Sequence, residues 1–303
     1  MFLSNVVQFD IPLLPDPAGL DIIHLQCHIG TDTLSLARRG AKSVVGLDFS
    51  PASIKEGQHL AANAAGGEKL RFVEASTYDA LEVLTPGSFD LVFTGVGAIC
   101  WLPNIRQWAS VVSGLLKPGG KFFIREAHPM LWTLDEKIED RLAIRYPFFE
   151  TEQPMMFQDD STYMKLADDW KTFENATTLE WNHGIGEIVQ ALLDEGMEIT
   201  GLKEHRSIPW DALPRQMVEL GNGEWSSVCS ITTSAELMMF LRRICFEGGT
   251  GTNTAVLHFA GCQEEMRHVL HPGSSCNNSF TSRSIANCLS FVCESRPRRG
   301  LRC

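Results

Sequence analysis

The sequence predicts an α/β fold in which helices cover both faces of a doubly wound, mostly parallel sheet, giving three layers. Three observations support this prediction. Short apolar runs bounded by glycine or proline recur through the first half of the chain, as buried parallel strands do. Segments with helical periodicity separate these runs. Polar or glycine-containing loops follow the runs directly, at the edge of a parallel sheet where ligands bind.

The first unit contains a strand, a loop, a helix and a second strand, at residues 21–25, 26–30, 31–39 and 43–47. Gly40 ends the helix, and Asp48 follows the second strand. Ser50 and Pro51 then open another helix, as an N-cap followed by proline at the first helical position. This order is that of a βαβ nucleotide-binding half.

Asp48 stands where a carboxylate can accept hydrogen bonds from both hydroxyls of a ribose, so a nucleoside-containing ligand is expected. A dinucleotide fold needs three glycines in the first loop so that the backbone can approach a pyrophosphate, and here only Gly30 fits. Compared with the S-adenosylmethionine pattern (acidic, x, Gly, x, Gly, x, Gly), His24 replaces the acid, and Gln26 and His28 replace the first two glycines. The loop therefore disfavours an NAD(P)- or flavin-dependent oxidoreductase.

Two segments, 24–33 and 46–51, resemble the class I S-adenosylmethionine-dependent methyltransferases that act on small molecules. A subgroup of these enzymes carries the same Leu-Gln-Cys-His loop, here residues 25–28. The similarity continues at residues 72–75, 89–92, 97–103 and 115–120 and resumes near 181–205. The resemblance implies a Rossmann-like fold, S-adenosyl-L-methionine as the cofactor, and transfer of its methyl group to an O, N, S or C nucleophile of a small molecule.

The resemblance also implies which residues contact the cofactor: Gln26, Cys27, His28, Gly30, Asp48, Phe49, Ser76, Thr77, Gly95 and Val96. Family members often have an aspartate at the position of Ser76, which hydrogen-bonds the adenine amino group. A serine hydroxyl can accept the same bond without charge assistance. The alternative is that Ser76 and Thr77 are ordinary loop residues. Gly95 and Val96 follow the fourth strand, expected at 89–94, at the edge where ligands bind.

The fifth strand, expected at 121–124, ends beside two candidates for a general base. His128 is the first, because its unperturbed pKa is about 6.5, and Glu126 is the second. Methyl transfer from a sulfonium needs no covalent residue, so positioning of the acceptor could be sufficient. In that case His128 is only a rim residue fixed by Pro129.

Two further residues are candidates for the substrate pocket. Trp101, in the loop after the fourth strand, either lines this pocket or covers the end of the sheet. His183 precedes a helix expected at 185–193 and is either a neighbour of the helix cap or a substrate-side group. Residues 129–178 are irregular and rich in aromatic residues and Met, so we predict that they cover the substrate. A packed satellite core is the alternative.

Composition divides the chain into residues 1–225, the predicted methyltransferase domain, and a tail at 226–303 that is rich in Cys, Ser and Arg. Relatives end with an apolar strand that completes the sheet, and residues 228–232 or 255–259 could replace it. The other interpretation is that the tail lies outside the fold, so that a chain ending near Trp225 would still fold. The tail contains four possible zinc ligands, Cys262, His268, His271 and Cys276. Their spacing does not match that of a zinc site, so no metal is expected.

Composition also restricts the partners. A formal charge of −11 argues against nucleic acid and favours a small neutral or cationic substrate. No apolar run is long enough to span a bilayer, and residues 1–15 lack the basic segment of a signal peptide. We therefore expect a cytoplasmic protein without a membrane partner, and the oligomeric state stays open.

The alternative to an active enzyme is a non-catalytic or degraded relative. Three features favour it: Ser76, the atypical tail, and a short amino terminus in which Pro12, Pro15 and Pro17 are expected to break any helix.

Overall fold

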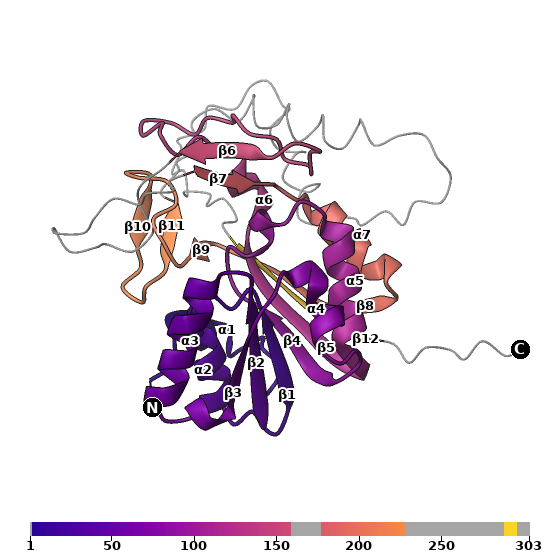
Figure 1. Ribbon diagram of the computed structural model, residues 1–303. Helices are drawn as coiled ribbons and strands as arrows, with labels where there is room; N and C mark the ends of the chain where they lie inside the picture. Colours follow the sequence, from indigo (N-terminus) through magenta and orange to yellow (C-terminus); the bar gives the residue numbers. More distant parts are fainter. Residues whose placement is uncertain (1, 159–176, 228–287, 296–303) are drawn as a thin grey trace, which may run out of the picture. The chain divides into compact units, whose positions relative to one another are not determined.

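The computed structural model describes residues 2–158, 177–227 and 288–295. Its main sheet has seven strands in the order β3-β2-β1-β4-β5-β12-β8 (Figure 1). These strands are β1 (Asp21–Leu25), β2 (Ser43–Asp48), β3 (Leu70–Glu74), β4 (Phe89–Thr94), β5 (Leu116–Ala127), β8 (Met197–His205) and β12 (Cys288–Ser295). The helices and 3₁₀ turns of the described residues are α1 (Asn5–Asp10), α2 (Thr31–Arg38), α3 (Pro51–Asn63), η1 (Gly67–Lys69), η2 (Thr77–Asp79), α4 (Ala80–Val83), η3 (Ile99–Trp101), α5 (Ile105–Leu115), α6 (Pro129–Trp132) and α7 (Ile185–Asp194).

The five strands from β3 to β5 pair in parallel with their neighbours. β12 pairs antiparallel with both β5 and β8. The predicted doubly wound, mostly parallel α/β sheet is therefore confirmed. Its carboxyl edge collects the loops that follow β1, β2, β3 and β4, because parallel strands end on the same side.

Successive side chains of the central strands face opposite sides of the sheet, because side chains alternate along a strand. Ile22 packs in a core that also contains residues of α1 and α2. Ile23 packs in a larger core with residues of α5 and α7, including the fully buried Trp108. Each face of the sheet thus has its own hydrophobic core, as the predicted three layers require.

The strand β12 lies between β5 and β8, so residues 288–295 of the predicted tail belong to the sheet. The side chains of Phe291 and Cys293 are fully buried in the larger core. The interpretation that the whole tail lies outside the fold is therefore wrong. Pairing with two distant strands fixes β12. The run at 289–293, with apolar residues at every second position, is a local strand signal that the change in composition at 226 obscured. Residues 228–232 and 255–259, as well as the four Cys and His residues considered for zinc, lie outside the described part of the chain.

The amino-terminal prolines follow a helix instead of preventing one. α1 begins after Ser4, whose hydroxyl accepts a hydrogen bond from Val7 N at 3.2 Å, and it ends at Asp10. The expectation of no helix in this segment was wrong. Proline lacks a backbone N–H only at its own position, and Pro12 lies past the last residue of α1, so no hydrogen bond of this helix is lost.

After β5 the chain leaves the main sheet and returns to it at β8. Between them the structure describes α6, α7 and a hairpin formed by β6 (Met155–Gln158) and β7 (Thr177–Glu180). A three-stranded sheet follows β8, with β9 (Ser207–Ile208), β10 (Met217–Glu219) and β11 (Trp225–Ser227). Residues 159–176 are outside the described residues, and the substrate cover at 129–178 stays a prediction.

Candidate functional site

The loop after β1 has a left-handed backbone at the three positions where the S-adenosylmethionine pattern has glycine. The φ angles are 55° at Gln26, 48° at His28 and 80° at Gly30. Residues other than glycine rarely adopt this conformation, so surrounding contacts must hold it. The Gln26 side-chain amide donates to Ala98 O at 2.7 Å, and His28 N donates to Asp48 Oδ2 at 2.8 Å. The backbone therefore supports the comparison of this loop with the glycine-rich pattern.

At Gly30, packing as well as backbone conformation requires glycine. A Cβ atom on Gly30 would overlap the ring of Phe72 on β3, and Gly46 of β2 and Gly57 of α3 approach the same ring. Cys27 packs against Gly46, and burial raises the pKa of its thiol to about 12, so the thiol stays uncharged. Phe72 thus fixes the loop, β2 and α3 against one another.

Asp48 is buried at the end of β2, and both of its carboxylate oxygens accept hydrogen bonds from the backbone. Oδ2 accepts from His28 N at 2.8 Å, and Oδ1 accepts from Ser50 N at 2.9 Å. Each oxygen can accept one more bond, so two ribose hydroxyls can still be bound. Phe49, the next residue, is 71% exposed, and its ring is accessible to a ligand.

The other predicted cofactor contacts lie at the same edge of the sheet. Gly95 and Val96 follow β4, and Ser76 and Thr77 follow β3. Ser76 Oγ accepts a hydrogen bond from Tyr78 N at 3.2 Å and caps η2, which is the local role that the sequence left as an alternative. Thr77 is buried, so its side chain is less accessible to a ligand than that of Ser76.

Glu126, the second predicted base, holds the loop after β4. Its side chain is buried, and each oxygen accepts two backbone hydrogen bonds. The donors are Gly97 N at 2.6 Å and Ala127 N at 2.8 Å for Oε1, and Ala98 N at 2.8 Å and Ile99 N at 3.1 Å for Oε2. Burial raises the pKa of this carboxyl, and the N–H groups oppose the shift. Because its acceptor capacity is used, the geometry favours Glu126 as an anchor of this loop, and its role as a base stays a prediction.

His128 caps the short helix α6, and both ring nitrogens are engaged. Nδ1 accepts a hydrogen bond from Met130 N at 3.1 Å, so the ring proton of the neutral form is on Nε2, which lies 3.1 Å from Glu204 Oε1. An imidazole in this state has no free nitrogen to accept a proton from a substrate. The geometry does not support the prediction of a general base and agrees with the alternative, a structural residue at the rim.

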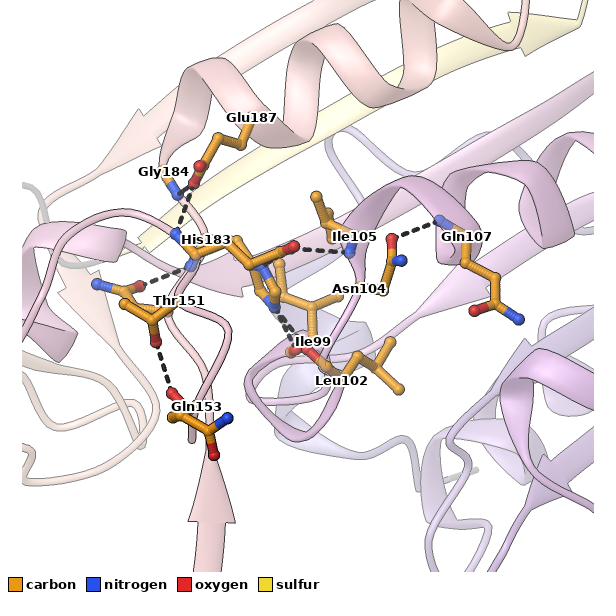
Figure 2. Close-up of polar contacts among 12 residues, drawn as sticks. Ile99, Leu102, Asn104, Ile105, Gln107, Thr151, Gln153, His183, Gly184 and Glu187 are labelled. Atoms are coloured by element: carbon orange, nitrogen blue, oxygen red, sulfur yellow. Dashed lines mark hydrogen bonds and ion pairs between the residues drawn. The ribbon is translucent and has the colours of Figure 1, made fainter. Parts of the chain in front are cut away.

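His183, in the segment that leads into α7, is buried against the loop after β4 (Figure 2). Its Nε2 lies 3.1 Å from Ile99 O and 2.9 Å from Leu102 O, and Nδ1 lies 2.9 Å from Glu150 Oε2. All these neighbours are acceptors, so Nε2 carries a proton. Only 2% of the residue is exposed, and its ring joins two loops, which favours the structural role; a place in the substrate pocket stays a prediction.

Two glutamates complete the network around His183. Glu150 Oε2 also accepts from Ile105 N at 2.9 Å, at the start of α5. Glu187 Oε2 accepts from Gly184 N at 2.7 Å and from Glu150 N at 3.0 Å (Figure 2 shows the bond from Gly184). Glu150 lies in an irregular segment with no periodic signal, so its place in this network could not be predicted from the sequence.

Trp101 is 44% exposed, and its indole Nε1 donates to Gly97 O at 2.9 Å. Trp181 N donates to Cys100 O at 2.8 Å, which places the end of the β6–β7 hairpin beside η3. The ring of Trp101 therefore remains accessible at this edge. Both of its proposed roles, lining a pocket and covering the sheet, are compatible with the geometry.

A buried guanidinium links α1 to β5. Arg125 Nε lies 2.8 Å from Asp10 Oδ1, and Nη1 lies 3.2 Å from Glu224 Oε1. The guanidinium carbon lies 4.3 Å from the centre of the Phe9 ring. Burial raises the pKa of Asp10 to about 7, although Arg125 opposes this shift. The members of this group are distant in the chain and meet only in the folded protein, so the sequence alone does not predict it.

A separate hollow of about 430 Å³ is lined by residues at the amino ends of strands, among them Asp21, Ser43 and Leu70. Ligands of open α/β sheets bind at the carboxyl ends, so we place the candidate site there and not in this hollow. Among the described residues, no group of three or more His, Cys, Asp or Glu side chains is placed to hold a metal ion. No helix in the same residues is long and apolar enough to cross a membrane.

Residues 23–122 match the sequence model of a family described as a methyltransferase domain. A protein of Oryza sativa subsp. japonica named "Probable tocopherol O-methyltransferase, chloroplastic" is 24% identical over 200 residues, 65% of this chain and 54% of the relative. "Ubiquinone biosynthesis O-methyltransferase, mitochondrial" of Dictyostelium discoideum is 31% identical over 113 residues, 35% of each chain. This chain thus spans about half or less of the length of these curated relatives.

A solved structure of an S-adenosylmethionine-dependent methyltransferase from Mesorhizobium loti superposes with a TM-score of 0.52 at 15% sequence identity. The superposition covers 96% of this chain and 98% of that chain. This likeness shows a shared fold.

Proposed function

We propose that this chain, which has a methyltransferase domain at residues 23–122 and the fold of class I S-adenosylmethionine-dependent methyltransferases, transfers a methyl group from S-adenosyl-L-methionine to a small molecule. One observation carries the proposal. The three left-handed positions at Gln26, His28 and Gly30 reproduce the backbone of a glycine-rich loop, and the loop is bonded to Asp48. We also propose that the chain belongs to the subgroup with the Leu-Gln-Cys-His loop and that the protein is located in the cytoplasm.

The residues at this edge fit the cofactor. The remaining acceptor capacity of Asp48 suits the two ribose hydroxyls. Gln26 Oε1 is buried and has no hydrogen-bond partner among the described residues, so it can accept from the ammonium group of the methionine part. Phe49 and Ser76 would flank the adenine, and Gly95 and Val96 would border the methionine part.

When bound, S-adenosylmethionine supplies a methyl group attached to a positively charged sulfonium. The residues of this chain then have three tasks: to bind the nucleoside, to align the nucleophile of the acceptor with the methyl group, and to exclude water. Trp101 and the residues of the β6–β7 hairpin are candidates for the last two tasks, because they lie beside the loop after β4.

The two alternative functions are less well supported. Side chains at Gln26 and His28 would obstruct a pyrophosphate, which argues against an NAD(P)-dependent oxidoreductase. The non-catalytic alternative loses one of its supports, because β12 completes the sheet.

Calorimetric titration with S-adenosylhomocysteine, with NAD as the control, tests the proposal. We expect binding of S-adenosylhomocysteine and none of NAD. The mass of any nucleoside that copurifies with the protein gives an independent result. Binding of NAD alone would establish the oxidoreductase alternative, and binding of neither ligand would favour the non-catalytic one.

A further inference from the structure

Glu180, at the end of β7, has an available carboxylate oxygen beside the candidate site. Oε1 accepts a hydrogen bond from Thr178 Oγ1 at 3.0 Å, and the described residues provide no hydrogen bond to Oε2. The other acidic and basic candidates are already engaged. Both oxygens of Asp48 and of Glu126 accept from backbone N–H groups, and both nitrogens of His128 are bonded.

Glu180 lies on the less exposed face of the β6–β7 hairpin. Met155 is paired with Glu180, and Phe157 is paired with Thr178, so these four side chains share one face. The opposite face is open, with Met156 69% exposed. A carboxylate among apolar side chains on the inner face needs a partner or a function, because burial of a charge is costly.

The hairpin holds Glu180 at the loop after β4. Trp181, the next residue, donates its backbone N–H to Cys100 O at 2.8 Å. Burial, followed by the negative charges of Glu126 and Glu180, raises the pKa of the Cys100 thiol. The Glu180 carboxylate is thus close to the edge of the sheet where the loops of the candidate site meet.

Two aromatic rings lie on the same side as Glu180. Tyr146 packs edge-on against Phe157, with ring centres 5.1 Å apart. Burial is the main cause of the raised pKa of Tyr146; the positive charge of Arg145 opposes the shift, and Glu180 is the last of three carboxylates that add to it, which places the Glu180 carboxylate near this ring. The guanidinium carbon of Arg145, which is paired with Asp135, lies 5.6 Å from the centre of the Tyr146 ring, so that ring already has a cation partner. The Glu180 carboxylate remains as the group that attracts further positive charge.

No cation compensates the charge of Glu180 within the described residues. Burial raises its pKa, the Thr178 hydroxyl lowers it, and Glu136 raises it further. The formal charge of −11 on the whole chain also favours the approach of cationic ligands. A protonated amine would supply the missing positive charge, whereas a neutral hydroxyl compound would not.

We propose that Glu180 binds the ammonium group of an amine methyl acceptor and takes one of its protons. The inference rests on the proposed function. The N–H bond breaks as a bond forms between the proton and Oε2, and its electron pair stays on nitrogen. That pair then forms the N–C bond to the methyl group, while the C–S bond breaks and its electrons remain on sulfur. The proton on Glu180 passes to water after the reaction.

A matched pair of probes tests this inference without requiring turnover. The protein is saturated with S-adenosylhomocysteine and titrated with 2-phenylethylamine, which is cationic at neutral pH, and with 2-phenylethanol, its neutral counterpart. We expect the wild-type protein to bind the amine at least about tenfold more tightly than the alcohol. Glu180→Gln, which keeps the shape and removes the charge, should abolish the preference. Glu152→Gln, at an exposed carboxylate of the same region, should retain it.

Equal affinities for the two probes, no binding of the amine at millimolar concentration, or an unchanged preference in Glu180→Gln would overturn the inference. The comparison in the wild-type protein does not depend on any variant folding. Binding of S-adenosylhomocysteine without a preference for the amine counts against the role of Glu180 alone. Failure to bind S-adenosylhomocysteine counts against the proposed function and removes the inference with it.

Discussion

His28 and Asp48, 20 residues apart in the chain, are joined by a 2.8 Å hydrogen bond from the backbone nitrogen of His28 to Oδ2 of Asp48. The bond holds the loop after β1 in the left-handed conformation that His28 would otherwise rarely adopt. Asp48 therefore has a structural task as well as the proposed contact with ribose.

Asp48→Ala should weaken binding of S-adenosylhomocysteine by roughly tenfold to a hundredfold, because hydrogen bonds to a charged group contribute about 1.5–3 kcal/mol. It should also lower the free energy of unfolding by about 1–3 kcal/mol, because His28 N and Ser50 N lose their acceptor. Calorimetric titration and urea denaturation measure the two effects. Asp48→Asn, which keeps one acceptor oxygen, should lie between the wild type and Asp48→Ala. Unchanged affinity in a folded Asp48→Ala protein would exclude the proposed ribose contact.

His128→Asn should retain methyl transfer to within about threefold, because asparagine preserves the cap of α6 and the geometry gives His128 no free nitrogen. A general base at this position would instead require a loss of about 10² to 10⁴ in turnover. The comparison is made by measuring the rate at which each protein releases S-adenosylhomocysteine with the same amine acceptor. A loss of that size with unchanged cofactor affinity would restore the prediction of a base.

The buried His24 should make the folded protein less stable at acidic pH. This residue is 3% exposed, its Nδ1 lies 2.9 Å from Thr33 Oγ1, and burial lowers its pKa to about 3. Below about pH 6.5 the unfolded chain binds a proton at this residue and the folded protein does not, so stability is lost as the pH falls toward 3. Between pH 7 and pH 5 the loss in unfolding free energy should be about 2 kcal/mol.

Urea denaturation of the wild type and of His24→Gln at the two pH values isolates this effect. The wild type should lose about 2 kcal/mol more than the variant, since all other titrating groups are common to both. Equal losses would show that His24 is protonated in the folded protein.

Phe291→Ala should lower the free energy of unfolding by about 3–5 kcal/mol, because the side chain is fully buried in the core beside β5 and β8. A chain that ends at Ser227 should lose cooperative unfolding, since β5 and β8 would both lack their shared partner. Thermal denaturation followed by circular dichroism compares the three proteins. A truncated chain that melts within about 5 °C of the full protein would show that β12 is dispensable.

The sequence by itself determined the α/β class, the strands expected at 21–25, 43–47, 89–94 and 121–124, and the position of Asp48. Local features were sufficient for these, because apolar runs, helical periodicity and capping residues act within a few residues of one another. The positions of Gln26, His28 and Gly30 in the glycine-rich pattern were also readable from the spacing alone.

Only the tertiary structure gave the hydrogen-bond partners of Glu126, His128 and His183, whose side chains are engaged by backbone groups or side chains of other segments. It also placed β12 in the sheet and Glu180 beside the loop after β4. These features depend on contacts between residues that are distant in the chain. The type of a residue determines which hydrogen bonds its side chain can form. Only the folded chain determines which of its hydrogen-bonding atoms remain free.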